Sequence, residues 1–443
     1  MNKIKVGFLS LGCPKNTCDT EVMLGLLNEK GYELVAEDIY ADVMVINTCA
    51  FIKSAKEEAI ESILDVAYLK EHHNLKGIVV TGCLATRYAK DIEKDLPEVD
   101  AILSAGDEGK ICEAVEAAYR GEKYISTAPT ENLAFGGDRV VTTPEHTAYL
   151  KIAEGCDNRC AYCSIPDIRG KFRSRDADDI INEAHTLYDL GVRELCLVAQ
   201  DTTRYGLDLS GRYMLAELLE RLCTEKDLDF KWIRLLYCYP DKITDELVEV
   251  MAKYDKIAKY IDMPIQHIND RVLSAMNRHG GREVIESAIE RLRHAMPDIT
   301  IRTTVITGFP TETAEEFEEL LSFVKDARFE RLGAFPYSRE ENTPAYDMKQ
   351  VPEKQREKRC ERVMEAQYQI HAENNERAVG KTITVLTEGW DPVGETYYGR
   401  SEADAPEIDG KVYFSAKRRL RDGEFVEVKI TGTLDYDLIG KQI

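Results

Sequence analysis

Short apolar runs alternate with amphipathic stretches over the first part of the chain. Four runs, KVGFLSLG, VMVINT, GIVVTG and AILSA, are each followed by a segment whose apolar positions have helical spacing. Unbroken apolar runs between helices are typical of a parallel sheet that is covered on both faces. The pattern therefore predicts a parallel α/β domain over residues 1–120.

The same alternation resumes after a break. Residues 121–145 contain two prolines and a Gly-Gly pair among polar residues and show no periodicity, which indicates a linker. Six further apolar runs then alternate with helical patterns: TAYLKIAE, ELCLVAQ, WIRLLYCY, YIDMPIQ, ITIRTTVITGF and RLGAFPYS. Six βα units are fewer than the eight of a closed barrel, so residues 146–375 are predicted to form a partial (β/α)6 barrel.

The end of the chain has a third kind of pattern. A long polar helix is predicted over residues 352–379, and four short alternating runs follow Gly380: TITVLTEG, TYYGRS, KVYFSA and FVEVKITGT. Their glycine and aspartate turns predict a small all-β barrel over residues 376–443. No apolar run approaches the roughly 18 residues of a membrane span, and the first residues lack the features of a signal peptide, so we expect a cytoplasmic protein.

Charge and cysteine content narrow the possible partners. The formal net charge of −22 argues against a protein that coats nucleic acid, because phosphate binding needs a basic surface. The same charge favours encounter with a basic partner such as a ribosomal protein. The twelve cysteines are not expected to form disulfides, because the cytosol keeps thiols reduced. Metal binding is the better interpretation for those that cluster.

Three cysteines lie within eight residues, directly after the first apolar run of the barrel region. Cys156, Cys160 and Cys163, here called the loop cysteines, can converge on one metal centre. A structural zinc site usually has four protein ligands, and no fourth cysteine or histidine follows closely. Three thiolates instead fit a [4Fe–4S] cluster with one iron left open for another ligand. A structural zinc knuckle is the alternative.

Three other cysteines share a different context. Cys13, Cys49 and Cys83, here called the strand-end cysteines, each follow a predicted buried strand. The carboxyl ends of parallel strands meet at one edge, where ligands bind, so these thiols are expected to converge on a second cluster. The alternative is three core cysteines, because free cysteine is among the most buried residue types. The remaining cysteines are interpreted as packing residues: Cys18, Cys112, Cys196, Cys223, Cys238 and Cys360.

The loop cysteines, with Tyr162 before the third of them, resemble the motif of radical S-adenosylmethionine (SAM) enzymes, and the predicted barrel is similar to theirs. A three-cysteine domain, this barrel and a small β-barrel, in that order, resemble the methylthiotransferase family over essentially the whole chain. The resemblance implies that the last module is a TRAM domain. It also implies two [4Fe–4S] clusters, one that cleaves SAM to a 5′-deoxyadenosyl radical and an auxiliary one that delivers a methylated sulfur.

The family's substrates explain why two clusters and SAM are needed, because they carry the methylthio group on an unactivated carbon. General bases are tuned to work near neutral pH and cannot remove such a hydrogen, whereas a carbon radical can. The cofactors carry this step, and the protein supplies orientation and electrostatics. The resemblance further implies that one SAM supplies the methyl group and a second supplies the radical.

Further SAM contacts are expected where barrel strands end, because those positions face the active-site mouth. The candidates are Tyr162, Gln200, Gln266, Arg302 and Gly308. Each can equally be a structural group. The basic run at residues 169–175 follows the loop cysteines and is either a solvated surface run or a site for a carboxylate of SAM or of the substrate, held by bidentate pairing.

The family divides into enzymes that act on tRNA adenosine and a branch that modifies the β-carbon of an aspartate in small-subunit ribosomal protein S-twelve. Several segments resemble the protein-modifying branch: residues 154–175, 197–208, 232–240, 260–267 and 399–414. Residues 9–23 also resemble it, except that Thr17 and Cys18 replace a more usual aliphatic pair.

The charge of the last module agrees with a protein substrate. Residues 376–443 hold 10 Lys and Arg against 13 Asp and Glu, which suits a basic protein better than a phosphate backbone. A local group, Lys417, Arg418, Arg419 and Arg421, is a candidate for contact with ribosomal RNA. We expect a monomer that needs an external electron donor and no membrane. The alternatives are a tRNA adenosine methylthiotransferase and, from another class, a non-catalytic iron–sulfur protein.

Overall fold

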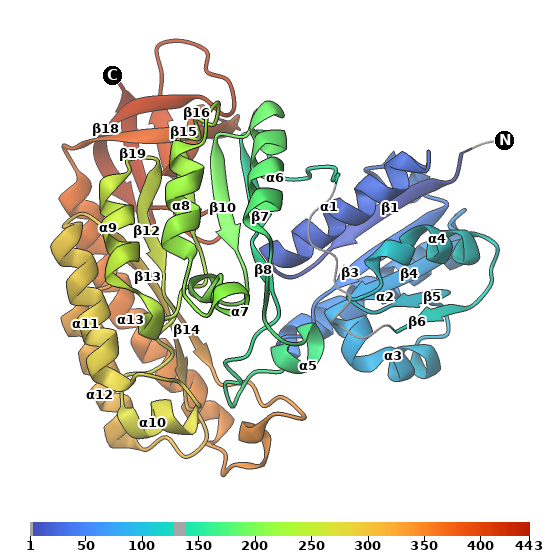
Figure 1. Ribbon diagram of the computed structural model, residues 1–443, viewed down its shortest axis with the longest axis horizontal. Coiled ribbons are helices and arrows are strands. Elements are labelled where there is room, and N and C mark those ends of the chain that lie inside the picture. Colours follow the sequence, from blue (N-terminus) through green and yellow to red (C-terminus); the bar gives the residue numbers. More distant parts are fainter. Residues whose placement is uncertain (1–2, 128–137) are drawn as a thin grey trace.

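Three sheet-based units follow one another in the computed structural model, which describes residues 3–127 and 138–443 (Figure 1). The first is a six-stranded parallel sheet in the order β2-β1-β3-β4-β5-β6. Its strands are β1 (Lys5–Ser10), β2 (Glu33–Val35), β3 (Val43–Thr48), β4 (Gly77–Gly82), β5 (Ala101–Leu103) and β6 (Tyr124–Ser126). Strands β3 and β4 are buried along their whole length, because their apolar side chains alternate between two covered faces.

Helices cover both faces of this sheet. Helices α1 (Pro14–Glu29) and α4 (Ile111–Tyr119) pack on one face through Met23, Leu27 and Val115. Helices α2 (Lys53–His72) and α3 (Cys83–Asp95) pack on the other face. The unit is thus the predicted parallel α/β domain.

The second unit is an open parallel sheet that is curved into a partial barrel. Its order is β14-β13-β12-β11-β10-β7, so each new strand adds beside the previous one. The strands are β7 (Thr147–Lys151), β10 (Glu194–Val198), β11 (Trp232–Leu235), β12 (Ile257–Asp262), β13 (Thr300–Thr307) and β14 (Arg331–Pro336). The six-unit partial barrel predicted from the sequence is confirmed.

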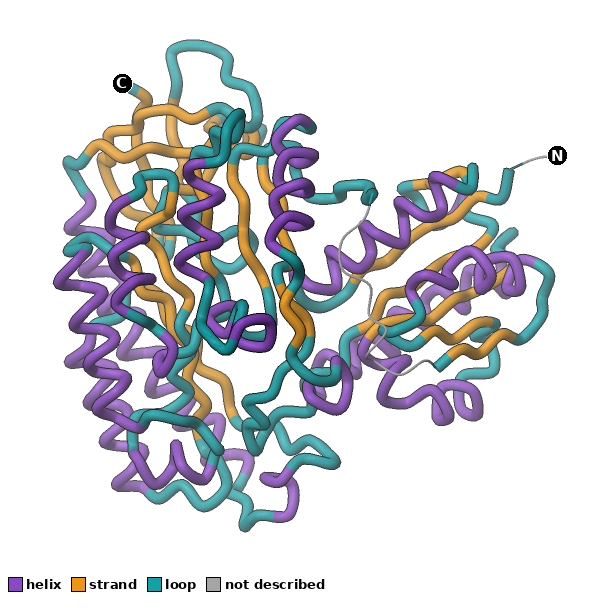
Figure 2. Tube along the Cα trace, in the orientation of Figure 1, coloured by secondary structure: helices purple, strands orange, loops and turns teal. Residues whose placement is uncertain are grey.

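Helices lie along the outer side of the barrel sheet (Figure 2). The long ones are α6 (Ala177–Asp189), α8 (Leu215–Thr224), α9 (Asp245–Lys253), α11 (Gly281–Ala295), α12 (Ala314–Ala327) and α13 (Glu353–Ala378). Helix α12 begins with a capping box, in which Thr313 and Glu316 satisfy each other's backbone N–H groups. Shorter elements near the strand ends are β8 (Ala153–Glu154), β9 (Arg173–Ser174), α5 (Ile165–Arg169), α7 (Leu207–Ser210) and α10 (Asp270–Ala275).

The third unit is a closed five-stranded barrel in the order β15-β16-β17-β19-β18. Its strands are β15 (Thr382–Asp391), β16 (Thr396–Ser401), β17 (Val412–Ser415), β18 (Phe425–Leu434) and β19 (Asp437–Gln442). Leu386 and Ala405 of this unit pack with Tyr149, Cys196 and Trp232 on the inner face of the barrel sheet. The C-terminal barrel therefore closes part of the interior of the partial barrel.

Buried charges hold the same interface together. Glu194 is fully buried and pairs with Arg400 of the C-terminal barrel at 2.5 Å and with Arg234 at 2.9 Å. Burial alone would raise the pKa of Glu194, but Arg400 and Arg234 lower it from its ordinary value of 4.5 to about 2. The folded state therefore favours the charged form. This contribution to stability is complete above pH 4.5 and is lost as the pH falls towards 2.

Glu194→Gln is expected to lower the free energy of unfolding by about 3–5 kcal/mol near neutral pH, because it leaves two buried guanidinium groups without their carboxylate. Urea unfolding followed by circular dichroism would measure the change. Glu220→Gln is the matched control, since Glu220 pairs with Lys253 at an exposed site, where such a change is within about 0.5 kcal/mol. Equal stability of the two variants would contradict the role given to Glu194.

Four strands were not predicted from the sequence: β2, β6, the two-residue β9 and β19. Strands β2 and β6 have three residues each, which is too short for an apolar run or an alternation to be visible. Strand β6 falls within the range predicted as a linker, where it pairs with β5, while residues 128–137 of that range lie outside the described residues. Strand β19 closes the C-terminal barrel between β17 and β18, and this closure depends on tertiary pairing.

Within the described residues, none of the helices has the length and apolar character needed to cross a membrane.

Candidate functional site

The strand-end cysteines meet at the carboxyl edge of the first sheet. Cys13 follows β1, Cys49 follows β3, and Cys83 is the first residue after β4. Gly12 has a φ of +99°, and a Cβ at this position would stand 3.3 Å from the sulfur of Cys49, so only glycine lets the turn pass so close. Burial raises the pKa of Cys49 to about 12, and the neighbouring Cys83 and Cys13 thiols contribute to this shift. The three thiols thus occupy one pocket.

The loop cysteines form a second compact group after β8. Cys156 and Cys160 are buried, and the backbone N–H of Cys163 donates to the carbonyl of Cys160. The Cys156 N–H donates to the carbonyl of Gly170, which closes the loop at its base. Asn277 donates to the carbonyls of Asn158 and Arg159 and fixes the loop from the barrel side. Burial raises the pKa of Cys156 to about 11, so the free thiol is protonated at neutral pH.

Neither group has the geometry of a site for a single ion. In the part of the chain that the structure describes, no three His, Cys, Asp or Glu side chains stand close enough to hold one metal ion. Thiolates that each bind a different iron of a cluster do not have to converge on one point. This finding concerns single ions alone, and both clusters remain predictions.

A short helix joins the two cysteine groups. Helix α5 begins just after Cys163, whose sulfur accepts a hydrogen bond of 3.4 Å from the Ile165 N–H. It ends at Arg169, whose Nη2 lies 3.5 Å from the sulfur of Cys83. Five helical residues span about 7.5 Å. Figure 1 shows α5 between the barrel and the first sheet, so the two cysteine groups flank this one helix.

Arg169 also anchors a buried charge network between the two units. Its Nη1 lies 2.6 Å from Asp19, its Nη2 donates to Asn16 at 2.6 Å, and Lys151 bridges Asp19 and Glu154 at 2.5 and 3.1 Å. Burial would raise the pKa of Glu154, but Lys151 and Arg169 lower it to about 2. The buried position of Arg169 excludes the surface alternative for this member of the basic run. Its partners are carboxylates of the protein itself.

The first unit touches the barrel at a second place. Lys56 and Arg87 pair with Glu340 at 2.8 and 2.9 Å, and Arg87 also donates to the carbonyl of Glu341. Glu340 lies in the loop after β14, at the opposite edge of the barrel sheet from Lys151 of β7. The first unit is therefore held at both edges of the barrel, and the strand-end cysteines face the barrel mouth between these contacts.

One segment after β11 reaches both cysteine groups. The ring of Tyr237 lies under the ammonium of Lys15, with 3.6 Å from Nζ to the ring centroid. The hydroxyl of Tyr239, two residues later, is 3.7 Å from the sulfur of Cys160. Arg278 is buried and stacks over the Tyr239 ring at 4.1 Å. These aromatic and basic side chains line the space between the two groups.

The five candidate SAM contacts have different surroundings. Tyr162 packs beside Phe309 and Tyr337, next to Cys160. Gln200 donates to Glu154, while its Oε1 is buried without a hydrogen-bond partner among the described residues. Gln200 therefore has a free acceptor near the loop cysteines, and it remains a predicted contact.

The other candidates are engaged in structural contacts. Gln266 has a φ of +68°, and its backbone pairs with β13. Arg302 pairs with Asp262 at 3.0 Å and with Asp409 at 3.5 Å, so its guanidinium is already held. The N–H of Gly308 donates to Glu312 at 2.8 Å. All three remain predictions as SAM contacts.

Sequence reasoning missed several residues of this site. Lys15, Asn16, Asp19, Tyr239 and Arg278 were not candidates, although four of them lie within the motifs around the cysteines or after β11. The available signal was the group of polar residues directly after Cys13. Their partners come from distant parts of the chain, which local patterns do not identify.

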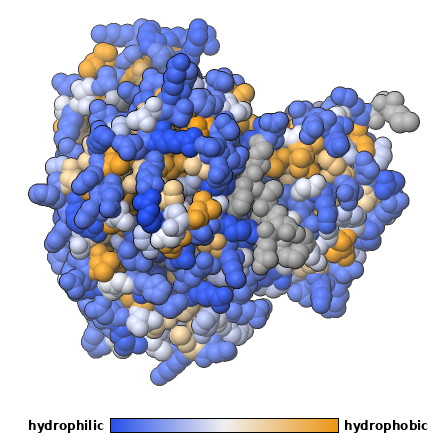
Figure 3. All heavy atoms as spheres, viewed as in Figure 1, coloured by the Kyte–Doolittle hydropathy of each residue, from blue (hydrophilic) through white to orange (hydrophobic). Residues whose placement is uncertain are grey.

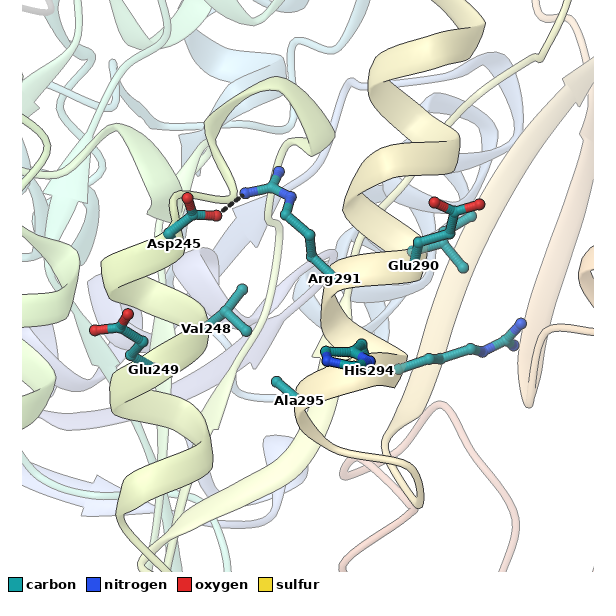
Figure 4. A pocket seen from close by; sticks show the side chains of 9 residues that line it. Asp245, Val248, Glu249, Glu290, Arg291, His294 and Ala295 are labelled. Carbon is teal, nitrogen blue, oxygen red and sulfur yellow. Dashed lines mark hydrogen bonds and ion pairs between the residues drawn. The ribbon is translucent and has the colours of Figure 1, made fainter.

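The outer surface also has a groove that holds none of these residues. This groove of about 800 Å³ lies between α9 and α11, and Arg291 pairs there with Asp245 at 2.7 Å. Figure 4 shows the side chains that line it. It lies on the helical outside of the barrel. The face in Figure 3 is mainly polar, with apolar residues scattered over it, as is normal for a protein surface. The region of the two cysteine groups, on either side of α5, is therefore the candidate site.

Three family models match successive parts of the chain. The Radical SAM superfamily matches residues 150–324, the Uncharacterized protein family UPF0004 matches residues 5–104, and the TRAM domain matches residues 379–443. These ranges correspond to the three units of the fold.

Curated relatives match over nearly the whole length. Proteins named "Ribosomal protein uS12 methylthiotransferase RimO" are 49% identical in a Thermoanaerobacter species, with 98% of this chain and 99% of the relative covered, and 48% identical in Desulforamulus reducens, with the same coverage. The relative in Clostridioides difficile is 46% identical, with 99% and 98% covered.

Among solved structures, the radical SAM methyltransferase TsrM from Kitasatospora setae has a TM-score of 0.58 at 15% identity, with 78% of this chain and 77% of that chain covered. The cobalamin-dependent SAM radical enzyme OxsB has a TM-score of 0.51 at 12% identity, with 83% and 58% covered. At these identities the likeness concerns the fold alone.

Proposed function

The chain belongs to the RimO family of radical SAM methylthiotransferases, and from this premise we propose that it attaches a methylthio group to the β-carbon of an aspartate in ribosomal protein uS12, the small-subunit protein S-twelve. Relatives with this name are nearly half identical to the chain over almost its whole length. The single structural observation that carries the proposal is the placement of two three-cysteine groups on either side of α5.

Each cysteine group has the chemistry of a cluster site. The loop cysteines would hold the [4Fe–4S] cluster that binds SAM, and the strand-end cysteines would hold the auxiliary one. Arg169 lies against Cys83, and Arg278 lies beside Cys160, so each group of thiolates has one buried guanidinium as a counter-charge. Burying anionic ligands beside a cation lowers the cost of removing their charge from water. When bound, the clusters and SAM supply the radical and methylated-sulfur chemistry.

The chain's own residues bind, orient and shield the reactants. The network of Asp19, Lys151, Glu154 and Arg169 fixes the first unit against the barrel, and with it the separation of the two cysteine groups. Tyr237 and Tyr239 fill space between the groups and exclude water. Such positioning matters because a misplacement of about 1 Å can cost on the order of a hundredfold in rate.

The remaining partners follow from the same proposal. An external one-electron donor is needed, and the enzyme acts as a monomer. Lys417, Arg419 and Arg421 are exposed on the C-terminal barrel and would meet ribosomal RNA, whereas Arg418 already pairs with Glu424. The substrate is made and assembled in the cytoplasm, and this gives the enzyme the same location.

Anaerobic reconstitution tests the function. The purified chain would be loaded with iron and sulfide and mixed with SAM and dithionite, with uS12 in one tube and unmodified tRNA in another. We expect mass spectrometry to find one methylthio group on one aspartate of uS12 and none on the tRNA. A product on tRNA alone would move the chain to the tRNA-modifying branch. Absence of SAM cleavage in both tubes would favour a non-catalytic iron–sulfur protein.

A further inference from the structure

Lys15 is a buried cation without an anionic partner. It lies two residues after Cys13, and 7% of its surface is exposed. Its ammonium rests on the ring of Tyr237, but it makes no ion pair or hydrogen bond among the residues that the structure describes. A buried charge normally has a partner, because removing it from water is costly.

The neighbouring cations differ from Lys15 in this respect. Lys151 and Arg169 share the carboxylates of Asp19 and Glu154, and Arg169 also contacts Cys83. The carboxylates of Asp19 and Glu154 are thus engaged by these other cations. Arg169 of α5 supplies the counter-charge to Cys83 from the barrel unit, whereas Lys15 belongs to the first unit and its ammonium meets Tyr237 of the barrel.

The position of Lys15 in its helix adds a second argument. It stands in the first turn of α1, after Cys13 at the N-cap and Pro14, and that turn holds no acidic residue. The first turn carries the positive end of the helix dipole and free backbone N–H groups, which favour an anion and disfavour a cation. A lysine in this turn is electrostatically unfavourable by itself. Its interactions become favourable when an anion binds between the ammonium and the end of the helix.

Lys15 lies between the two cysteine groups. It is next to Cys13, and its ring partner Tyr237 follows β11 at the barrel mouth, where Tyr239 of the same segment contacts Cys160. A ligand that binds the free side of the ammonium would therefore stand between the two proposed clusters. The Tyr237 ring has no formal charge, so this contact leaves the ammonium without an anion to pair with.

We propose that Lys15 binds the side-chain carboxylate of the substrate aspartate and so positions its β-carbon between the two cysteine groups. The β-carbon is bonded directly to that carboxylate carbon, so a cation that holds the carboxylate also fixes the carbon to be modified. An adenosine base has no carboxylate, and Lys15 therefore selects a protein over tRNA. This inference rests on the proposed function, and it makes Lys15 a specificity-determining residue of the same site.

A double-mutant cycle tests the contact. Affinity of the reconstituted full-length chain would be measured for uS12 and for uS12 with the modified aspartate changed to asparagine. The wild-type chain should bind the aspartate form about tenfold more tightly or better. Lys15→Met should remove this preference by weakening binding of the aspartate form alone, and Lys15→Arg should restore part of it. Lys30→Met, an exposed lysine at the other end of α1, is the matched control and should keep the preference.

The outcomes separate this inference from the proposed function. Equal weakening of both uS12 forms by Lys15→Met, or a loss of iron content, would overturn the inference and assign Lys15 to the fold or to cluster retention. An unchanged preference would overturn it as well. If the wild-type chain modifies tRNA and not uS12, the proposed function itself fails. If it modifies uS12 while the cycle shows no coupling, only the role of Lys15 fails.

Discussion

Cys156→Ala is expected to reduce reductive cleavage of SAM to roughly one-hundredth of the wild-type rate or less. Even the substitution of a residue that only contacts a metal ligand lowers metal affinity or activity by about 10–100-fold. Only two of the three loop thiolates would remain, and the cluster with its open iron would not be held. Iron content should fall by about half, because the auxiliary cluster keeps its own ligands. Anaerobic assays of 5′-deoxyadenosine with dithionite, together with iron analysis, would measure both effects.

Cys223→Ala is the control for this variant. Cys223 is nearly as buried as Cys156, but it lies on α8 at the outer side of the barrel and belongs to neither cysteine group. It should keep wild-type SAM cleavage and iron content. Wild-type cleavage by Cys156→Ala would remove the loop cysteines from the proposed SAM site.

Cys49→Ala should separate the two halves of the reaction. Its loop cysteines are intact, so SAM cleavage by dithionite is expected to persist, while methylthio transfer to uS12 should fall to about one-hundredth or less because the auxiliary cluster is lost. Mass spectrometry of uS12 and quantification of 5′-deoxyadenosine in the same tube would show the separation.

Cys112→Ala provides the comparison within the same unit, because Cys112 is partly buried on α4, away from the sheet edge. It should retain both activities. Methylthio transfer at the wild-type rate by Cys49→Ala would show that the strand-end cysteines do not hold the sulfur source.

The fold was largely predictable because parallel strands leave a strong local pattern. The runs VMVINT and GIVVTG coincide with β3 and β4, since both faces of these strands are covered and no charged residue interrupts them. The meeting of the strand-end cysteines followed from the same topology. Strand β19 had no such pattern, because it completes a small barrel in which only alternate residues are buried.

The site was less predictable than the fold, because its partners come from different units. The basic run that begins at Arg169 was expected to be either a solvated surface run or a site for a carboxylate of SAM or of the substrate, whereas Asp19 of α1 pairs with Arg169. Arg302 was predicted as a SAM contact, whereas Asp409, more than a hundred residues later, holds its guanidinium. Such pairs depend on how the units dock, and docking leaves no periodic pattern in the chain.

The place of Arg169 has a consequence for biosynthesis. The strand-end cysteines are complete once the first hundred residues have been made, but the guanidinium beside Cys83 belongs to the following unit. At about 5–20 residues per second, the ribosome needs on the order of seconds to add that segment. During this interval the nascent pocket has three thiols and no guanidinium beside them. Iron is therefore expected to enter after the barrel has emerged, and carriers that load it should act on the finished polypeptide.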